Sequence, residues 1–542
     1  MTQFPRFQNG CKKRLASVEW IGEINMNGAD DLCDTLIAHS VDVCFANPGT
    51  SEMHFVAALD RKPQMRCILG LFEGVVTGAA DGYARMAGKP AAALLHTGPG
   101  LANGLANLHN ARRAFSPVVT VVGDHASYHL DYDAPLTSDI ESLALPMSEW
   151  VYRVKGADDV AHGAAAACEA AQRLSSVATM ILPADAAWGE TRAKKFSKAT
   201  PVEKPVIDNH EIKAAVKAIL THPARCGILL DGEALHSENL DLLEQIAASH
   251  NVELYAPVFI SRLSRGAGRP ALKRIPYPVD EAVAMLAHLD VLILVGAIPP
   301  VAFFAYPGKP SALTPKTCKL ISLASVCDNI PDALARLGDA LGVSTLRRIP
   351  KRSLALKAVK PTGKLTEDAV AVLLAQTLPD QAIISDEALT SARRFYALSE
   401  SAPPHDYMMV TGGAIGVGIP LSTGAAVACP HRKVIALQAD GSGMYTLQGL
   451  WTQARERLDV VTIILNNRGY AILQHEMKNV GVPVHGGNAE RMMRIDDPGL
   501  DWVSLAAGMG VEGARAETCT QFADLLTLAF RRAGPFLIEA MI

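Results

Sequence analysis

Two polar turns in the C-terminal third of the chain carry residue types that suit a divalent cation and a phosphate group. An apolar run at residues 434–437 leads into Asp440-Gly441-Ser442-Gly443, and a second apolar run, at 460–465, ends in Asn466-Asn467. Strand, turn, helical segment and strand in this order predict neighbouring parallel strands whose carboxyl ends share one edge of a sheet. A carboxylate, a side-chain amide and backbone N–H groups there suit a hard cation that holds a diphosphate. An ordinary turn with a solvated aspartate is the alternative interpretation.

A second candidate is Glu73, which stands in Leu71-Phe72-Glu73-Gly74-Val75-Val76 where a strand pattern passes into a helix pattern. A carboxylate between apolar neighbours is costly to bury without a partner. From the residues alone, two interpretations stay open. Glu73 either complements the positive end of the helix, or it exchanges a proton with a bound group in an apolar setting.

Both stretches resemble signature blocks of thiamine diphosphate (ThDP) enzymes. That family has Gly-Asp-Gly, a spacer and Asn-Asn; here Asn467 follows Asp440 by 27 positions, and Ala439 replaces the first glycine. The segment FEGVVTGAADGYARMAGKP resembles the block of ThDP decarboxylases and synthases whose glutamate contacts the cofactor's pyrimidine. The resemblance covers residues 27–542 and is to the acetolactate synthase large subunit-like and benzoylformate decarboxylase-like branch.

The resemblance implies which residues bind the cofactor and Mg²⁺. Glu73 would contact the pyrimidine, while the carbonyl of Gly413 and the side chain of Ile415 would hold ThDP in its bent form. The metal ligands would be Asp440, Asn467 and the backbone oxygen of Gly469. The residues whose hydroxyl and N–H groups would bind the diphosphate are Thr390, Ser391, Gly441 and Ser442.

The same resemblance implies catalytic residues in the first part of the chain, besides Glu73. Thr50, in Asn47-Pro48-Gly49-Thr50, matches a family position near the substrate carboxylate. His96, just before Gly98-Pro99-Gly100, matches an active-site histidine that can donate a proton. A single histidine at the end of a strand is otherwise more often structural.

Three departures separate the chain from both named enzymes. Ala305 stands where benzoylformate decarboxylases have a second active-site histidine, and Gln474-His475-Glu476 stands where acetolactate synthases have a tryptophan. The Phe-Gln segment of the synthases is replaced by Ala134-Pro135-Leu136. The identity of the 2-oxo acid substrate is therefore left open.

The function that the resemblance predicts is a ThDP- and Mg²⁺-dependent 2-oxo acid decarboxylase or carboligase, acting through a C2 ylid and an enamine. Release of an aldehyde, as in benzoylformate decarboxylase, is the alternative, as is a cofactor-binding homologue with an unusual substrate. Which outcome holds depends on pocket donors such as His96, His125 and Glu476. The resemblance leaves room for FAD, although no flavin-binding motif occurs. A Rossmann-type oxidoreductase is disfavoured, because the glycines at 98–104 miss the Gly-x-Gly-x-x-Gly spacing by one.

The elements that must position these residues form three α/β domains. Strands that are apolar on both faces, with helices between them, predict doubly wound parallel sheets. The predicted parts are an N-terminal extension (1–26), a pyrimidine-binding domain (27–190), a middle domain (205–345) and a diphosphate- and Mg²⁺-binding domain (366–542). Because the family's cofactor spans two subunits, we expect a homodimer or homotetramer with inter-subunit sites.

Composition excludes several classes of partner. The 542 residues are 49% hydrophobic and 20% charged, with a net charge of −4, which is typical of a soluble protein with a large core. There is no basic run beyond Lys12-Lys13-Arg14 and no 18-residue apolar run, so neither a nucleic-acid partner nor a membrane span is expected. Ten scattered cysteines without a CxxC pair are expected to be reduced thiols in the cytoplasm.

Overall fold

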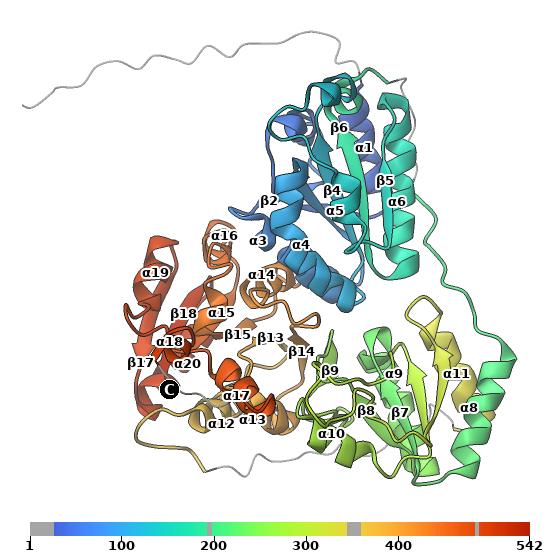
Figure 1. The fold of residues 1–542 in the computed structure, drawn as a ribbon, viewed down its shortest axis with the longest axis vertical. Helices are drawn as coiled ribbons and strands as arrows, with labels where there is room; N and C mark the ends of the chain where they lie inside the picture. Colours follow the sequence, from blue (N-terminus) through green and yellow to red (C-terminus); the bar gives the residue numbers. More distant parts are fainter. Residues whose placement is uncertain (1–25, 192–197, 344–358, 483–486) are drawn as a thin grey trace, which may run out of the picture.

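Three sheets, each packed between helices, follow one another along the chain (Figure 1). The computed structural model describes residues 26–191, 198–343, 359–482 and 487–542. All but one of the neighbouring strand pairs are parallel, so the predicted fold class of doubly wound α/β domains is confirmed. The predicted extension, apart from Met26, lies outside the described residues, and the predicted domain boundaries stay a prediction.

The first sheet has the strand order β2-β1-β3-β4-β6-β5. Its strands are β1 (Val43–Asn47), β2 (Arg66–Leu69), β3 (Ala91–His96), β4 (Val118–Asp124), β5 (Trp150–Arg153) and β6 (Val177–Pro183). One face packs against α3 (Glu73–Ala87), α4 (Thr97–Arg113) and α5 (Ile140–Ala144). The other packs against α1 (Gly28–Ala38), α2 (Met53–Leu59), α6 (Val160–Leu174) and α7 (Ala184–Trp188). Because helices cover both faces, the central strands are buried along their length.

The second sheet has the order β10-β8-β7-β11-β12 and is parallel throughout. Its strands are β7 (Cys226–Leu230), β8 (Glu253–Ala256), β10 (Lys273–Arg274), β11 (Val291–Val295) and β12 (Lys319–Ala324). Its helices are α8 (Asn209–Thr221), α9 (Ser237–His250), α10 (Val279–Leu286) and α11 (Ile330–Ala340). The strand order reverses direction between β7 and β11, which makes their carboxyl ends a topological switch point.

The third sheet has the order β17-β18-β16-β15-β13-β14-β9. Its C-terminal strands are β13 (Ala382–Glu387), β14 (His405–Met409), β15 (Val434–Ala439), β16 (Val460–Asn466), β17 (Glu512–Ala516) and β18 (Phe536–Met541). Its longer helices are α12 (Glu367–Thr377), α14 (Gly418–Ala428), α17 (Ala471–Asn479) and α20 (Cys519–Arg531). The shorter ones are α13 (Arg393–Leu398), α15 (Asp440–Gly443), α16 (Gly449–Arg455), α18 (Gly487–Arg491) and α19 (Trp502–Gly508).

One edge strand of the third sheet comes from the middle part of the chain. β9 (Leu263–Arg265) pairs antiparallel with β14, with Leu263 opposite Tyr407 and Arg265 opposite His405. The sequence pattern did not predict this strand, because three residues are too few to show a period. The middle and third domains therefore share a sheet.

The first and third domains pack through α3 and α14, which lie side by side in Figure 1. A Cβ at Gly82 would stand 2.0 Å from the carbonyl oxygen of Leu421, and one at Gly424 would stand 1.8 Å from that of Ala79. Only glycine permits backbones to approach this closely. The two helices thus fix how the half of the chain that holds Glu73 meets the half that holds Asp440.

Arg85, near the C-terminal end of α3, ties all three domains together. Its guanidinium pairs with Asp81 over 2.6 Å in a fully buried setting. It also donates to the carbonyl oxygens of Ser261 (3.1 Å) and Met409 (2.8 Å), which belong to the second and third domains. A buried guanidinium with all these acceptors is satisfied, so it stabilises the arrangement.

Candidate cofactor-binding and active site

The carboxyl ends of β15 and β16 bring Asp440 next to the turn that follows β16. The two strands are parallel neighbours, and the Arg468 N–H donates to Asp440 Oδ2 over 2.7 Å. The Gly441 N–H donates to Asp440 Oδ1 over 2.9 Å. Burial raises the pKa of the Asp440 carboxyl, and these N–H donors oppose that shift. A cation at this edge would favour the ionised carboxylate.

The two asparagines of the turn differ in what they contact. Asn466 is buried, and its Nδ2 donates to Glu539 Oε1 over 2.7 Å, so it anchors the turn to β18. Asn467 is less buried, and its Oδ1 accepts the N–H of Gly469 over 3.1 Å. Between Asn467 and Gly469, Arg468 has a left-handed backbone with φ of 60°. The structure thus gathers the three predicted metal ligands in one turn region; their role as ligands stays a prediction.

Gly441 and Ser442 form a buried turn of helix directly after Asp440. A Cβ at Gly441 would stand 2.5 Å from the Tyr470 ring, so the position requires glycine. The Ser442 hydroxyl accepts a hydrogen bond from Gln438 Nε2 over 2.6 Å. Both residues therefore lie beside the predicted metal ligands, where a diphosphate would have to be held.

Thr390 and Ser391, the other predicted diphosphate ligands, follow β13. The Ser391 hydroxyl is buried and donates to Glu367 Oε1 of α12 over 2.6 Å, so this donor already has a partner. Thr390 is half-buried. Neither hydroxyl has a hydrogen bond to the 440–442 turn in the described structure, and their role stays a prediction.

Glu387, at the end of β13, is a buried residue that the sequence analysis missed. Its Oε1 accepts the N–H of Gly416 over 2.5 Å, and its Oε2 accepts the N–H of Gly418. Burial raises the pKa of Glu387 to about 7, against the lowering effect of these two N–H groups. The only sequence signal was an acidic residue at the end of an apolar run, at the same edge as Asp440.

The Gly412–Gly416 loop, predicted to hold the bent cofactor, is fixed by α4 of the first domain. Asn110 Oδ1 accepts the N–H groups of Gly412 (3.1 Å) and Ala414 (3.3 Å), and Asn110 Nδ2 donates to the Ala414 carbonyl over 2.7 Å. Gly413 has φ of 77°, a conformation that favours glycine. Ile415 is half-buried. The loop is thus held between Asn110 on one side and Glu387 on the other.

Aromatic residues of the middle domain stand over this loop. A Cβ at Gly413 would meet the Phe303 ring at 2.4 Å. The hydroxyl groups of Tyr306 and Tyr277 donate to the Glu476 carboxylate of α17 over 2.7 and 3.3 Å. Glu476, one of the predicted pocket donors, is therefore held at the boundary of the middle and third domains. Ala305, at the position of the absent second histidine, is exposed.

In the first domain, His96 pairs with a second residue that the sequence analysis missed. Its Nδ1 lies 2.8 Å from Oε2 of Glu52, which is fully buried and also accepts the Gly49 N–H over 2.7 Å. A Cβ at Gly123 would overlap Glu52 Oε1 at 1.6 Å, so glycine makes room for the carboxylate. Burial raises the pKa of Glu52, and His96 opposes that shift. With Nδ1 bound to Glu52, His96 Nε2 remains to move a proton.

Glu73 and Thr50 lie at the starts of helical segments in the same domain. Glu73 is the first residue of α3, half-buried, and accepts a hydrogen bond from Asn103 Nδ2 over 3.1 Å. Thr50 is exposed, at the start of the short helix that contains Glu52. In the described parts of the chain, the hydrogen bonds of Glu73 and His96 all stay within the first domain. One chain thus presents two half-sites, one in the first domain and one in the third, and no hydrogen bond of Glu73 or His96 joins them.

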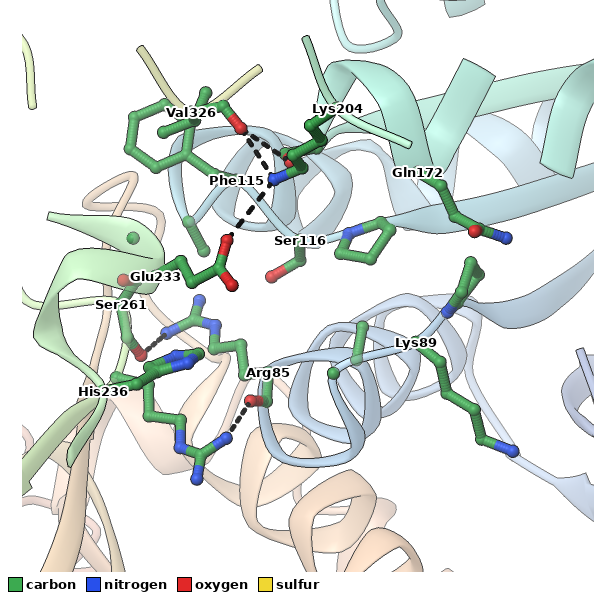
Figure 2. A pocket seen from close by; sticks show the side chains of 18 of the residues that line it. Arg85, Lys89, Phe115, Ser116, Gln172, Lys204, Glu233, His236, Ser261 and Val326 are labelled. Atoms are coloured by element: carbon green, nitrogen blue, oxygen red, sulfur yellow. Dashed lines mark hydrogen bonds and ion pairs between the residues drawn. The ribbon is translucent and has the colours of Figure 1, made fainter. Parts of the chain in front are cut away.

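A cavity of about 700 Å³ lies elsewhere, between the first and second domains (Figure 2). It opens at the switch point of the second sheet, the usual place for a nucleotide. Four lysine and arginine side chains line it, and each already has a partner: Lys204 donates to the Val326 carbonyl (2.8 Å), Lys89 pairs with Asp42 (2.7 Å), Arg262 pairs with Asp406 (3.0 Å), and Arg85 is bound as described above.

Carboxylates follow β7 at this switch point, the part of a doubly wound sheet that usually binds the phosphates of a nucleotide. β7 runs into Asp231-Gly232-Glu233, and burial raises the pKa of Asp231 to about 7. Glu233 also lines the cavity (Figure 2). These carboxylates do not fit the diphosphate of FAD, and the sequence has no flavin motif.

Comparison with known proteins assigns the chain to a family. The model described as "Thiamine pyrophosphate enzyme, N-terminal TPP binding domain" matches residues 26–144, and that of the "C-terminal TPP binding domain" matches 390–540. The Mycobacterium tuberculosis protein named "Putative acetolactate synthase large subunit IlvX" is 46% identical over 95% of this chain and 99% of its own length. The chain belongs to the thiamine pyrophosphate enzymes. Thiamine pyrophosphate is ThDP, so the predicted resemblance is confirmed.

Other proteins similar to this ThDP enzyme carry the second name that the sequence suggested, benzoylformate decarboxylase. Benzoylformate decarboxylase of Pseudomonas aeruginosa is 28% identical over 93% of this chain and 97% of its own length. The solved 4-hydroxybenzoylformate decarboxylase of Rhodococcus jostii RHA1 has a TM-score of 0.82 at 24% identity, covering 95% of this chain and 99% of that one. At that identity the solved structure shows the shared fold. None of the helices among the described residues is long and apolar enough to cross a membrane.

Proposed function

We propose that this ThDP enzyme decarboxylates a 2-oxo acid with the help of Mg²⁺ and joins the product to a second carbonyl compound. The observation that carries the proposal is the meeting of Asp440, the Asn467 turn and the Gly412–Gly416 loop at one edge of the third sheet. When bound there, ThDP supplies a nucleophilic thiazolium carbon and an electron sink for the carbon that loses CO₂. Relatives named acetolactate synthase and benzoylformate decarboxylase support the reaction class.

Mg²⁺ fits the oxygen donors at this edge. Asp440 offers a buried carboxylate, Asn467 a side-chain amide oxygen and Gly469 a main-chain oxygen, which are the ligand types that Mg²⁺ takes together with phosphate oxygens. The raised pKa of Asp440 indicates a carboxyl that lacks a compensating positive charge. A cation bound by these three residues would supply that charge and hold the diphosphate beside Gly441 and Ser442.

The chain's own residues divide the remaining work. The Gly413 carbonyl and the Ile415 side chain would orient the cofactor, while the Glu73 carboxyl would hold or release a proton at the pyrimidine. Thr50 would bind the substrate carboxylate. His96, with Glu52 at its Nδ1, would hold a proton at Nε2 for the carbonyl or carbanion of the reacting substrate.

Two chains are needed for a complete site in this proposal, as a homodimer or a pair of dimers. Within the described residues, the hydrogen bonds of Glu73 and His96 do not reach the third domain of their own chain. Apolar side chains are exposed beside each half-site: Met53 and Leu71 near Thr50 and Glu73, and Tyr445 next to the cofactor-binding turns. Exposed apolar surface of this kind is typical of an interface. Free thiols at every described cysteine suit the cytoplasm.

Product NMR tests the proposal directly. The purified chain would be given ThDP, Mg²⁺ and a panel of 2-oxo acids, including pyruvate and benzoylformate, alone and paired with aldehydes. A hydroxyketone or an acetohydroxy acid as product supports the carboligase. If no acid loses CO₂ while ThDP is bound, the proposal is wrong and the chain is a cofactor-binding homologue.

A decarboxylase that releases an aldehyde is a second candidate, and one observation favours it. The buried Glu52–His96 pair places a proton donor among the active-site residues, and proton delivery to the reacting carbon would end the reaction as an aldehyde. Aldehyde as the sole product, in the presence of an excess of a second carbonyl compound, would select this candidate.

A further inference from the structure

Three cysteines of the first domain lie together, outside the proposed active site. Cys44 of β1 and Cys67 of β2 are direct partners in the register of two parallel strands. Cys33 of α1 packs in the same buried apolar cluster as Cys44. Cys33 and Cys44 are fully buried, whereas Cys67 is exposed at the edge of the sheet.

Cys44 and Cys67 stand at paired positions of β1 and β2, so their side chains lie on the same face of the sheet. The interaction between the two thiols raises the pKa of Cys44 and lowers that of Cys67, and the Cys44 thiol donates to the Phe45 carbonyl over 3.7 Å. Paired residues of neighbouring strands have Cα atoms about 5 Å apart, which lies inside the range that a disulfide spans. An exposed thiol that becomes a thiolate more readily, next to a second thiol, is the arrangement of a redox-sensitive pair.

We propose that Cys67 and Cys44 form a peroxide-oxidised dithiol, with Cys67 as the attacking and Cys44 as the resolving thiol. The Cys67 thiolate attacks a peroxide oxygen, the O–O bond breaks, and Cys67 becomes a sulfenic acid while hydroxide leaves and takes up the thiol proton as water. The Cys44 sulfur then attacks the Cys67 sulfur, the S–O bond breaks, and a second water leaves. Two electrons pass from the two thiols to one hydrogen peroxide, and one disulfide and two waters result.

The pair stands where a covalent bond would bear on the active site. β1 continues from Cys44 into the Asn47–Thr50 turn, and β2 continues from Cys67 to Glu73. Asn47 Nδ2 already bonds the Gly70 carbonyl across the same two strands over 2.8 Å. A disulfide would therefore link the two strands just before the residues that we assign to substrate and pyrimidine.

The other cysteines among the described residues do not share this arrangement. Cys327 is half-exposed, but burial raises the pKa of its thiol, and its sulfur donates to the Leu174 carbonyl over 3.7 Å. Cys226 and Cys318 are both buried, and burial raises the pKa of each, but β11 lies between β7, which begins at Cys226, and β12, which follows Cys318. Cys327 is the matched control for exposure, and Cys226 and Cys318 are the controls for burial.

Peptide mapping of the full-length chain after treatment with hydrogen peroxide tests the proposal. Remaining thiols would be alkylated, and the protein would be cleaved before aspartate, because Asp34 and Asp42 separate Cys33 from Cys44. The expected result is a Cys44–Cys67 linked peptide, loss of two thiols per chain and their return with dithiothreitol. The Cys327→Ser variant should behave as the wild type does.

Two variants make the assignment falsifiable. In Cys44→Ser, the sulfenic acid at Cys67 has no resolving thiol, so dimedone should label Cys67. In Cys33→Ser, the Cys44–Cys67 linked peptide should still form. A Cys33–Cys67 link in the wild-type chain would overturn the assignment of Cys44. Faster oxidation of Cys327, Cys226 or Cys318 than of Cys67 would overturn the whole proposal.

Discussion

The first and third domains are both doubly wound sheets, yet they give their buried carboxylates different partners. Glu52 in the first domain faces an imidazole, His96, across 2.8 Å. Asp440 and Glu387 in the third domain face backbone N–H groups of glycine-rich turns. An imidazole can take or give up a proton near neutral pH, whereas a backbone N–H can only fix geometry. We infer that the first domain moves protons and the third domain holds the cofactor.

Glu73→Gln should give the largest effect on turnover. If the first domain moves protons, turnover should fall by about 10² to 10⁴-fold, while the affinity for ThDP changes far less. Steady-state kinetics and ThDP titration by intrinsic fluorescence measure the two quantities. Glu456→Gln, which removes a surface pair with Arg66, is the control. Equal losses of affinity and turnover in Glu73→Gln would contradict the division between the domains.

Asp440→Asn should show the opposite signature. Loss of a metal-binding carboxylate should weaken Mg²⁺-dependent ThDP binding by at least about 100-fold, because even outer-shell partners of a metal contribute that much. Turnover at saturating cofactor should recover in part. ThDP titration at several Mg²⁺ concentrations is the measurement, with Asp459→Asn, in the same domain and paired with Lys433, as the control. A Mg²⁺ dependence equal to that of the wild type would show that Asp440 binds no cation.

Gly123→Ala should disrupt the Glu52–His96 pair although it replaces no titratable side chain. The added Cβ would stand 1.6 Å from Glu52 Oε1, so the carboxylate must move, at a cost of about 1–3 kcal/mol in stability. Turnover should fall by about 100-fold, the low end for a misplaced proton donor. Gly156→Ala, in the same domain with open space around its Cβ, is the matched control. Thermal unfolding and kinetics measure both effects, and wild-type turnover in Gly123→Ala would remove His96 from the mechanism.

Glu387→Gln should change only the pH dependence of stability in the cofactor-free protein. The carboxyl is protonated in both states below its unfolded pKa of 4.5, but between pH 4.5 and about 7 only the folded state keeps the proton. Glu387 therefore contributes a loss of stability as pH rises through that window, worth about 3 kcal/mol. Between pH 4.5 and pH 7.5, the free energy of unfolding should fall less in the variant than in the wild-type protein. Parallel pH profiles would mean that the pKa of Glu387 is the same in the folded and unfolded states.

Local patterns in the sequence were enough to predict the strands and turns that hold Asp440 and Asn467. Strands buried on both faces appear as continuous apolar runs, and the 460–465 run became part of β16 (Val460–Asn466), whose seven residues are all buried. The turn residues could be predicted because parallel strands of one sheet end at the same edge. Glu73 likewise lies at the start of a helix, as the change from a strand pattern to a helix pattern predicted.

Residues whose importance depends on distant partners escaped prediction. Glu52 becomes notable only because Gly123, on another strand, leaves room for it beside His96. Glu387 matters through N–H groups that lie about thirty residues further along the chain. Such contacts arise from the packing of the sheet and carry no periodic signal in the sequence. The Ser391–Glu367 hydrogen bond was hidden for the same reason.

The antiparallel pairing of β9 with β14 limits where this enzyme can be cut. A shortened chain that begins at residue 359 would contain every predicted metal ligand, yet it would leave the backbone N–H and C=O groups of β14 without the partner that Leu263–Arg265 supplies. An open strand edge recruits other chains. We therefore expect the isolated C-terminal fragment to aggregate on expression, and to stay in solution when a peptide that covers β9 is supplied with it.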